Sequence, residues 1–518
     1  MFVPLRADPK TLHKTTVDFL VIGGGIQGAS IARETALRGA TVLLVEKDDF
    51  GCGTSSQSSR LIHGGLRYLE HGRMSLVREA LQERERLLRL APHLVRPLPM
   101  LMPFYKGGSR RPWIVKAGLK LYGLLAGSHS LPGARSHGVD DCLRLFPRLR
   151  RRDLLGGSVF YDARTTDQRL TMAVVEAAHE AGAKILNHVA VEGVADGGVC
   201  MRDVLTDLEL SVRAKFIVNA TGPGVDRVRS LLGVEGSDLV RVSRGSHVVL
   251  DPMPGELALA AFLPDKRIQF VIPHGDGTIC GTTEVESEIR ESRADDAAFP
   301  DSDLQYLLGA LEYLFESPPS RGDVRSAYTG WRTLPTGKGP AGGANREAFL
   351  ECEVGKIGTV HTVVGGKLTT HRSFAERAIN GLLGLRSPSP SRDQYLPGGT
   401  GPQEFGDPLW WRHGDRAPKL RAMAADRSDL LEPICPHRDL LRVEAAFSLR
   451  EQATMTFVDL MRRRLFHSQG PCLHENCLDA CHELFTEFKP EGAFAEATAD
   501  KAELIEQVGR AVGVLHRL

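Results

Sequence analysis

Residues 17–28 read Val-Asp-Phe-Leu-Val-Ile-Gly-Gly-Gly-Ile-Gln-Gly, and this stretch decides the fold. The six residues before the glycines form a short, largely apolar run of the length of a buried strand. A helical pattern follows through Leu37, and a second apolar run, 41–45, ends on Glu46. We therefore predict a strand, a glycine turn, a helix and a second strand that ends on an acid.

This order of elements is typical of a dinucleotide-binding site. Gly23 permits the tight turn, Gly25 lets the helix N-terminus approach a pyrophosphate, and Gly28 allows close packing of helix on strand. The positive end of the helix stabilises the phosphate charge. Glu46 is placed to accept hydrogen bonds from an adenosine ribose. The alternative is a purely structural turn.

Length and composition exclude several classes of protein. The chain has 518 residues, which predicts three to four domains at roughly 150 residues each. Hydrophobic residues make up 42% and charged residues 25%, as in a globular protein, and the net charge of +1 does not suggest a nucleic-acid binder. The sequence shows no apolar run long enough to span a bilayer and no secretory signal. We expect reduced cysteines and a cytoplasmic protein.

The segment 53–70 indicates which dinucleotide binds. It reads Gly-Thr-Ser-Ser-Gln-Ser-Ser-Arg-Leu-Ile-His-Gly-Gly-Leu-Arg-Tyr-Leu-Glu and is dense in hydroxyls, small residues and cations. Such a loop suits a ligand with a pyrophosphate and a polar ring system. A solvated serine-rich loop would explain the serines but not the stretch from His63 to Tyr68.

With this loop the sequence resembles the FAD-dependent glycerol-3-phosphate dehydrogenases of the D-amino-acid-oxidase-like flavoprotein superfamily. Further blocks match in order along residues 16–400, and they are 160–170, 216–223, 245–247, 265–273, 281–284, 328–332 and 364–370. Some positions depart from the family pattern. They include Arg244, His274, Trp331, Thr333 and His371, which we expect around the substrate pocket.

The resemblance implies oxidation of sn-glycerol 3-phosphate to dihydroxyacetone phosphate, with hydride transfer to flavin N5 and electrons passed to a membrane quinone. It implies these FAD-binding residues: Gly23, Gly25, Gly28, Glu46, Thr54, Ser55, Ser56, His63, Gly64, Gly65, Val191, Ala220, Thr221, Gly222, Gly366, Lys367, Leu368 and Thr369. It places Arg67, Tyr68, Arg332, Arg346 and Lys367 at the substrate.

The residue types fit this chemistry. A dianionic phosphate ester needs cations, and arginine forks are suited to it. Alcohol oxidation also needs a proton acceptor, for which His63 and His247 are the candidates because histidine titrates near neutral pH. We therefore name Arg332, His63 and His247 as catalytic. Two enzyme alternatives remain, an O₂-using oxidase and a flavin oxidoreductase acting on another hydroxy acid or amine. A catalytically decayed flavin-binding module is a third reading.

The motif order predicts a Rossmann-like α/β FAD-binding domain that is discontinuous, from residues 16–105, 155–240 and 325–385. Residues 106–154 and 241–324 are expected to form an antiparallel-sheet cap over the substrate. The proline- and glycine-rich stretch 386–399 is expected to be a linker. A helical pattern at 440–464 predicts a C-terminal α-helical domain over 400–518. The oligomeric state stays open, with a homo-oligomer as one option.

Residues 110–122 combine Arg110, Arg111, Lys116 and Lys120 with Trp113 and aliphatic residues. A basic amphipathic helix of this kind can lie in an anionic headgroup layer, although packing on the protein core is the alternative. The family's members are commonly peripheral membrane enzymes. The resemblance therefore implies attachment to the inner face of the cytoplasmic membrane.

Four cysteines crowd the C-terminal part of the chain. The spacing of Cys435, His437, Cys472 and Cys477 looks like a degenerate form of a small [2Fe–2S] domain found in some anaerobic relatives, with histidine replacing one cysteine. Residues 453–464 also resemble the plain helical domain of the aerobic family. We favour buried reduced thiols and predict no metal.

Overall fold

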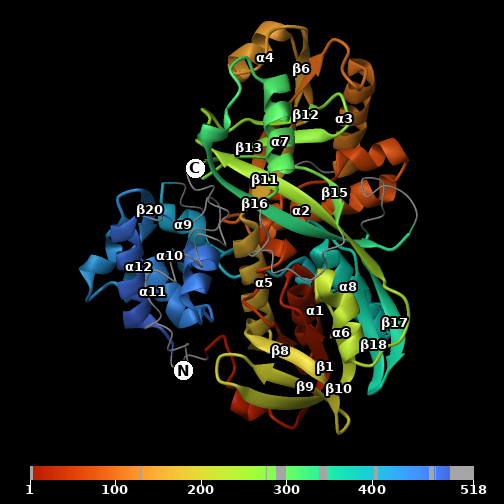
Figure 1. Ribbon diagram of the computed structural model, residues 1–518, viewed down its shortest axis with the longest axis vertical. Helices are drawn as coiled ribbons and strands as arrows, with labels where there is room; N and C mark the ends of the chain where they lie inside the picture. Colours follow the sequence, from red (N-terminus) through yellow and green to blue (C-terminus); the bar gives the residue numbers. More distant parts are fainter. Residues whose placement is uncertain are drawn as a thin grey trace.

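A computed structural model describes residues 4–127, 131–275, 277–287, 299–337, 347–401, 406–465, 472 and 474–490. Two sheets form the lower and upper parts of the molecule in Figure 1, and a group of C-terminal helices lies beside them on the left. None of the helices in the described ranges is long and apolar enough to cross a membrane.

The first sheet contains the glycine turn. Its strands follow the order β17-β18-β10-β1-β2-β7, with β9 pairing β10 and β8 pairing β9. The pairs among β18, β10, β1, β2 and β7 are parallel. The strands are β1 (Thr15–Ile22), β2 (Val42–Val45), β7 (Lys184–Leu186), β8 (Val189–Ala195), β9 (Gly198–Asp203), β10 (Leu208–Asn219), β17 (Phe349–Gly355) and β18 (Gly358–Val364).

Strand β1 is buried on both faces, which explains its nearly continuous apolar sequence. Phe19 and Val21 pack into one core, while Leu20 and Ile22 point into another, because successive side chains alternate across a strand. The first core includes residues of three helices, among which α1 contacts both others: α1 (Ile26–Leu37), α5 (Asp167–Glu180) and α8 (His371–Leu383). The helix α6 (Val225–Leu231) follows β10.

The second sheet is mostly antiparallel and has the order β15-β11-β14-β13-β12-β4-β6-β3, with β16 on β11 and β5 on β6. The pair β4–β12 is parallel. The strands are β3 (Leu61–Ile62), β4 (Val95–Tyr105), β5 (Arg135–His137), β6 (Leu154–Thr165), β11 (Val240–Leu250), β12 (Ala258–Phe262), β13 (Ile268–His274), β14 (Gly277–Gly281), β15 (Val285–Ser287) and β16 (Val324–Pro335).

Four helices lie beside this second sheet: α2 (Met74–Leu90), α3 (Pro112–Ala126), α4 (Val139–Leu145) and α7 (Asp301–Leu314). The architecture agrees with the predicted α/β domain and antiparallel cap. The domain ranges stay a prediction, but the strand pairing adds a detail. Strands β4, β6 and β16, which our ranges assign largely to the FAD-binding domain, pair within the sheet of the cap.

The C-terminal region has its own apolar core. Its elements are α9 (Pro408–His413), α10 (Ala417–Met423), β19 (Pro433–Cys435), β20 (Arg438–Leu441), α11 (Arg442–Glu451), a π-helical segment (Asp459–Leu465) and α12 (Glu475–Phe488). The helical pattern expected at 440–464 is therefore interrupted. Ala453 adopts a positive φ of 51°, and Asp459 accepts a hydrogen bond from the backbone N–H of Thr456 at 3.0 Å. These features end α11 and start a separate segment.

Residues 386–399 are fixed to the protein. Leu396 is part of the main core, and the hydroxyls of Ser389 and Ser391 both donate to the buried carboxylate of Glu34. Glu376 of α8 accepts hydrogen bonds from the Ser389 N–H and from Arg392. The segment is irregular in secondary structure but densely hydrogen-bonded.

Candidate active site

A cavity of about 1030 Å³ lies at the carboxyl ends of β1 and β2 and reaches the second sheet. Parallel strands commonly bind ligands at this edge. The cavity brings together most of the predicted site residues: Gly23, Gly25, Glu46, Thr54, Ser55, His63, Gly64, Gly65, Tyr68, Val191, Ala220, Thr221, Gly222, His247, Arg332, Gly366, Lys367, Leu368 and Thr369. Their individual roles stay predictions.

Two predicted residues, Gly28 and Ser56, do not line the cavity but support segments that do. A Cβ at Gly28 would lie 1.9 Å from the carbonyl oxygen of Gly23, so only glycine allows α1 to pack this closely on the turn. Gly23 itself has a φ of +107° and no room for a side chain, because Ala220 O would lie 2.6 Å from its Cβ. The hydroxyl of Ser56 donates to Gly53 O at 3.3 Å and stabilises the adjoining loop.

Glu46 lines the cavity at the end of strand β2. Its carboxylate accepts hydrogen bonds from the backbone N–H of Gly24 at 2.6 Å and of Asp48 at 3.0 Å. Burial raises the pKa of Glu46, and the nearby charge of Asp48 adds to this effect. The carboxylate therefore lies in a poorly solvated position, where it can accept hydrogen bonds from ribose hydroxyls.

The hydroxyl-rich loop is held against the start of α1 and against the cap. Ser55 Oγ accepts a hydrogen bond from the Ile26 N–H at 2.9 Å. The Gly64 N–H donates to the Tyr122 hydroxyl at 2.7 Å, and that hydroxyl donates to Asp162 at 2.9 Å. These contacts fix the backbone of residues 54–65 along the cavity.

The late glycine motif approaches from the segment that precedes α8. Gly366 has a φ of +125°, and a Cβ there would collide with the side chain of Gln27. The Gln27 amide donates to Lys367 O at 3.2 Å. Thr369 Oγ1 accepts from the His63 N–H at 3.2 Å and donates to His63 O at 3.3 Å. The two predicted motifs therefore meet, although His63 and Thr369 are 306 positions apart in sequence.

Two predicted cations line the cavity, Arg332 on strand β16 of the second sheet and Lys367 in the segment before α8. Arg332 donates to Thr282 Oγ1 at 2.8 Å and to Thr283 O at 3.2 Å. A Cβ at Gly245 would collide with its guanidinium group, so the glycine makes room for the arginine. The Lys367 ammonium lies 3.8 Å from the centre of the Tyr68 ring.

His247 lies beside Arg332 and is buried. Its Nε2 is 2.8 Å from Ser59 Oγ, and its ring stacks on Tyr328 with centroids 4.8 Å apart. Burial lowers the pKa of His247 well below its usual value, and the positive charges of Arg332 and Arg60 lower it further. The imidazole is therefore neutral at physiological pH, which is the form that can accept a proton, while the same effects make it a weaker base.

Two predicted substrate residues lie outside the described part of the chain: Arg346 entirely, and Arg67 in its side chain. Conversely, the sequence analysis missed residues that line the cavity. Gln27 and Ser59 lie inside quoted motifs, and their positions next to the glycines are the signal that could have identified them. Five further lining residues lie in the stretch 453–464 that resembles the family's helical domain: Thr456, Phe457, Val458, Asp459 and Arg463. His188, His482 and Phe485 carry no local motif.

Buried ion pairs attach the C-terminal region to Asp49 and His188, which line the cavity. Arg464 binds Asp49 through two hydrogen bonds of 2.6 and 2.9 Å, and His188 Nε2 lies 2.9 Å from Asp459. Burial opposes a charge on His188, but Asp459 outweighs it and raises the pKa of the imidazole. This network places the C-terminal side chains beside the cavity.

The four residues of the C-terminal cysteine and histidine cluster also lie close together in the structure. The donor atoms of Cys435, His437, Cys472 and Cys477 all lie within 4.8 Å of one another, and none of the four residues lines the cavity.

The cavity fits FAD. Its volume is at the upper end of small-molecule sites, as a dinucleotide with a three-ring system requires. Its lining includes a glycine turn, the N-terminus of α1, an acid and the 366–369 backbone. The residues Gly23, Gly25 and Glu46 would hold the adenosine diphosphate part, and residues 63–65 and 366–369 the ring system.

Comparison with known proteins agrees with this site. A family model described as FAD dependent oxidoreductase matches residues 18–372. A glycerol-3-phosphate dehydrogenase of Synechocystis sp. is 35% identical over 495 residues, covering 88% of this chain and 89% of that protein. Glycerol-3-phosphate dehydrogenase 2 of Mycobacterium tuberculosis is 36% identical over 489 residues, covering 88% and 82%.

Among solved structures, the glycerol-3-phosphate dehydrogenase from Bacillus halodurans complexed with FAD aligns with a TM-score of 0.75 and 26% identity, covering 98% of both chains. These findings confirm the predicted fold class, the FAD cofactor and the resemblance. The chain belongs to the FAD-dependent oxidoreductase family and, within it, to the FAD-dependent glycerol-3-phosphate dehydrogenases.

Proposed function

We propose that this protein oxidises sn-glycerol 3-phosphate to dihydroxyacetone phosphate at the inner face of the cytoplasmic membrane and passes the electrons to a quinone. The observation that carries the substrate is a cavity that fits FAD and is lined by Arg332, by the neutral His247 beside it and by Lys367. The names of the relatives support the same substrate. Bound FAD would supply the hydride acceptor for oxidation at C2 of the substrate.

The chain's cations bind and orient the phosphate ester. The guanidinium of Arg332 is held by Thr282 and Thr283, so its planar fork enters the site in one orientation. Lys367, against the Tyr68 ring, supplies a second positive charge. Unphosphorylated glycerol would leave these cations without an anion and should bind far more weakly.

The proton of the substrate hydroxyl needs an acceptor on the protein. His247 is neutral because of burial and its cationic neighbours, and the Ser59 hydroxyl fixes its ring. His63 is the second candidate, since it also lines the cavity and its backbone is bonded to Thr369. His247→Asn and His63→Asn distinguish them. The variant of the acceptor should lose kcat while keeping FAD, and the other should retain most of its turnover.

Helix α3 supports attachment to a membrane surface. Val115, Leu119 and Tyr122 face the protein, whereas Trp113 is 65% and Leu124 74% exposed. Arg111, Lys116 and Lys120 are exposed as well. Arg110 differs from the other cations, because it binds Glu70 at 2.7 and 3.0 Å. Exposed apolar side chains next to unburied cations suit an anionic headgroup layer, where each cation contributes about 1 kcal/mol.

Two measurements test the acceptor and the membrane. Turnover with a soluble quinone should greatly exceed turnover with O₂ alone, and faster turnover with O₂ would identify an oxidase. Wild-type protein should co-sediment with anionic vesicles, less at high salt.

A variant with Arg111, Lys116 and Lys120 changed to glutamine should stay in the supernatant and still reduce a soluble acceptor. A matched control changes three exposed cations of the first sheet and N-terminal segment, Lys10, Lys184 and Arg213, to glutamine. This control should sediment like the wild type. Equal sedimentation of both variants would exclude α3 as the attachment site.

A further inference from the structure

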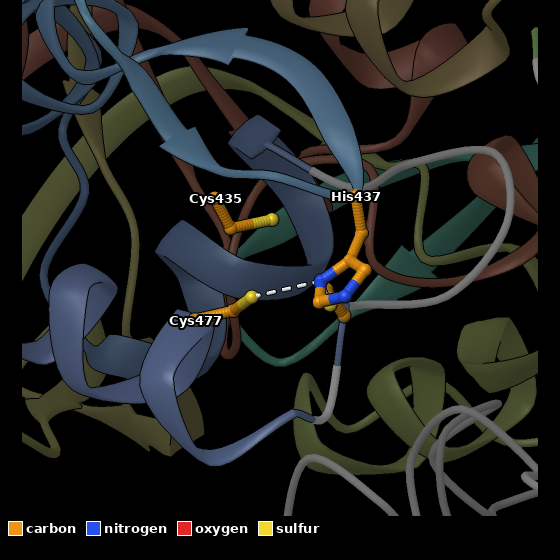
Figure 2. A group of neighbouring side chains, drawn as sticks. Cys435, His437 and Cys477 are labelled. Carbon is orange, nitrogen blue, oxygen red and sulfur yellow. Dashed lines mark hydrogen bonds between the residues drawn. The ribbon is translucent and has the colours of Figure 1, made fainter.

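Four side chains of the C-terminal region converge on one point. Cys435 ends strand β19, His437 lies in the turn before β20, and Cys477 lies in the first turn of α12. Figure 2 shows the three side chains pointing toward one another from the hairpin and the helix. Cys472 completes the group, and the four donor atoms lie within 4.8 Å of one another.

The spacing of these atoms fits a single tetrahedral ion. His437 Nδ1 lies 3.2 Å from Cys477 Sγ and 3.4 Å from Cys472 Sγ. Around a zinc ion with bonds of about 2.3 Å to sulfur and 2.0 Å to nitrogen, neighbouring donor atoms are about 3.5–3.8 Å apart. The observed distances are close to these edges, so the ion fits with small shifts of the side chains.

Hydrogen bonding alone does not account for the arrangement. A neutral imidazole nitrogen accepts through one lone pair, yet two thiols lie within reach of the same Nδ1. The three cysteines are buried, while His437 is exposed and closes the group on the solvent side. Buried thiols that gather around one nitrogen are the pattern expected of ligands, because thiolates and imidazole both bind zinc.

The surrounding elements hold the donor atoms in place. Cys477 lies in the first turn of α12. The His437 ring stacks on His474 with centroids 4.1 Å apart and 18° between the planes, which fixes its orientation. All four positions are supplied by protein, as in structural zinc sites.

We propose that Cys435, His437, Cys472 and Cys477 bind one Zn²⁺ as a structural site. A [2Fe–2S] cluster places its four ligands in two pairs around two irons and two sulfides, and donor atoms this close together leave room for one ion only. This inference does not depend on the proposed function. It replaces our sequence-based preference for reduced thiols without a metal.

The ion would join the β19–β20 hairpin to α12. The same helix carries His482 and Phe485, which line the cavity of the active site. A zinc site would therefore hold one wall of that cavity in place while remaining outside it.

The test is the metal content of the full-length flavoprotein, purified without chelators and analysed by elemental mass spectrometry. The expected result is one zinc per chain and no iron. Two irons per chain, or zinc far below one per chain after incubation with zinc and removal of the excess, would overturn the proposal.

Variants locate the ion. His437→Ala removes an exposed ligand and should leave the core intact, so its folding is not in question. Its zinc affinity, measured by competition with a chelating dye, should fall at least about tenfold, since even outer-shell changes cost this much. His437→Cys should restore tight binding through four thiolates.

Cys481→Ser is the matched control. Cys481 is a buried thiol one turn further along α12 and is not part of the group of four. It should keep one zinc per chain. Cobalt exchanged into wild type and control should give the visible bands of a tetrahedral thiolate site, beyond the flavin absorption. Equal zinc loss in Cys481→Ser and His437→Ala would contradict the assignment.

Discussion

Gly28→Ala adds one carbon at the position of α1 that tolerates it least. The new Cβ would lie 1.9 Å from Gly23 O, about 1.5 Å inside a normal contact. The obstructing atom belongs to a backbone turn that is tied to β2 by the hydrogen bond from Gly23 N to Val45 O at 2.8 Å. The helix and turn must therefore separate. We expect the free energy of unfolding to fall by about 3 kcal/mol, at the upper end of the usual cost of overpacking.

Gly25→Ala is the matched control in the same turn. Its Cβ would meet only Ser55 Oγ at 3.2 Å, a side chain that can move. We expect the free energy of unfolding of the apoprotein to fall by less than about 1 kcal/mol, the scale of a helix-cap change. The affinity for FAD should fall, because the pyrophosphate approaches the backbone at this position.

Urea unfolding of both apoproteins and titration with FAD separate the two effects. Gly28→Ala should be destabilised even without FAD. The reasoning is refuted if Gly28→Ala unfolds within about 1 kcal/mol of the wild type, or if the two apoproteins are equally destabilised.

Three further predictions concern charged groups. Arg332→Ala should lower kcat/KM about 30- to 5000-fold with FAD retained, since the loss of a charged partner costs about 2–5 kcal/mol of substrate stabilisation. A kcat/KM near that of the wild type would count against Arg332 as a substrate-binding residue. Arg464→Met should lower the free energy of unfolding, measured in urea, by about 3–5 kcal/mol, because Asp49 loses its buried partner. A decrease below about 1 kcal/mol would contradict this expectation. Burial alone would raise the pKa of Glu376, but hydrogen bonds from Arg392 and Arg372 outweigh burial and lower it to about 2. Its carboxylate therefore stabilises the fold fully above pH 4.5, the usual pKa, and this contribution is lost as the pH falls towards 2. Glu376→Gln should flatten the acid branch of the stability profile, and identical slopes would disprove the assignment.

The sequence identifies the nucleotide-binding strand, turn and helix because their signals are local. β1 begins two residues before the expected run and ends with it at Ile22, and α1 ends at the expected Leu37, since glycine spacing and apolar runs mark them directly. Most motif residues from Gly23 to Thr369 line one cavity for the same reason. Each motif is short, and its backbone contacts fix where it lies.

Other features depend on long-range contacts that no local pattern encodes. Strand β4 carries Pro97, Pro99 and Pro103, which reduce its strand propensity, and its pairing with β6 and β12 places it in the sheet of the cap. The cavity residues of α12 depend on the docking of the C-terminal region, to which the Arg464–Asp49 pair contributes across 415 positions of sequence. The spacing of the four metal-ligand candidates is visible in the sequence, but their convergence requires the hairpin and α12 to meet.

The most direct test of the central claim is reduction of the bound flavin without oxygen. One equivalent of sn-glycerol 3-phosphate, added anaerobically to the FAD-loaded protein, should bleach the flavin and yield dihydroxyacetone phosphate in equal amount. Glycerol at the same concentration should leave the flavin oxidised, because it lacks the anion that Arg332 and Lys367 bind. Flavin that stays oxidised with sn-glycerol 3-phosphate, or that glycerol or an amino acid bleaches equally well, would contradict the account.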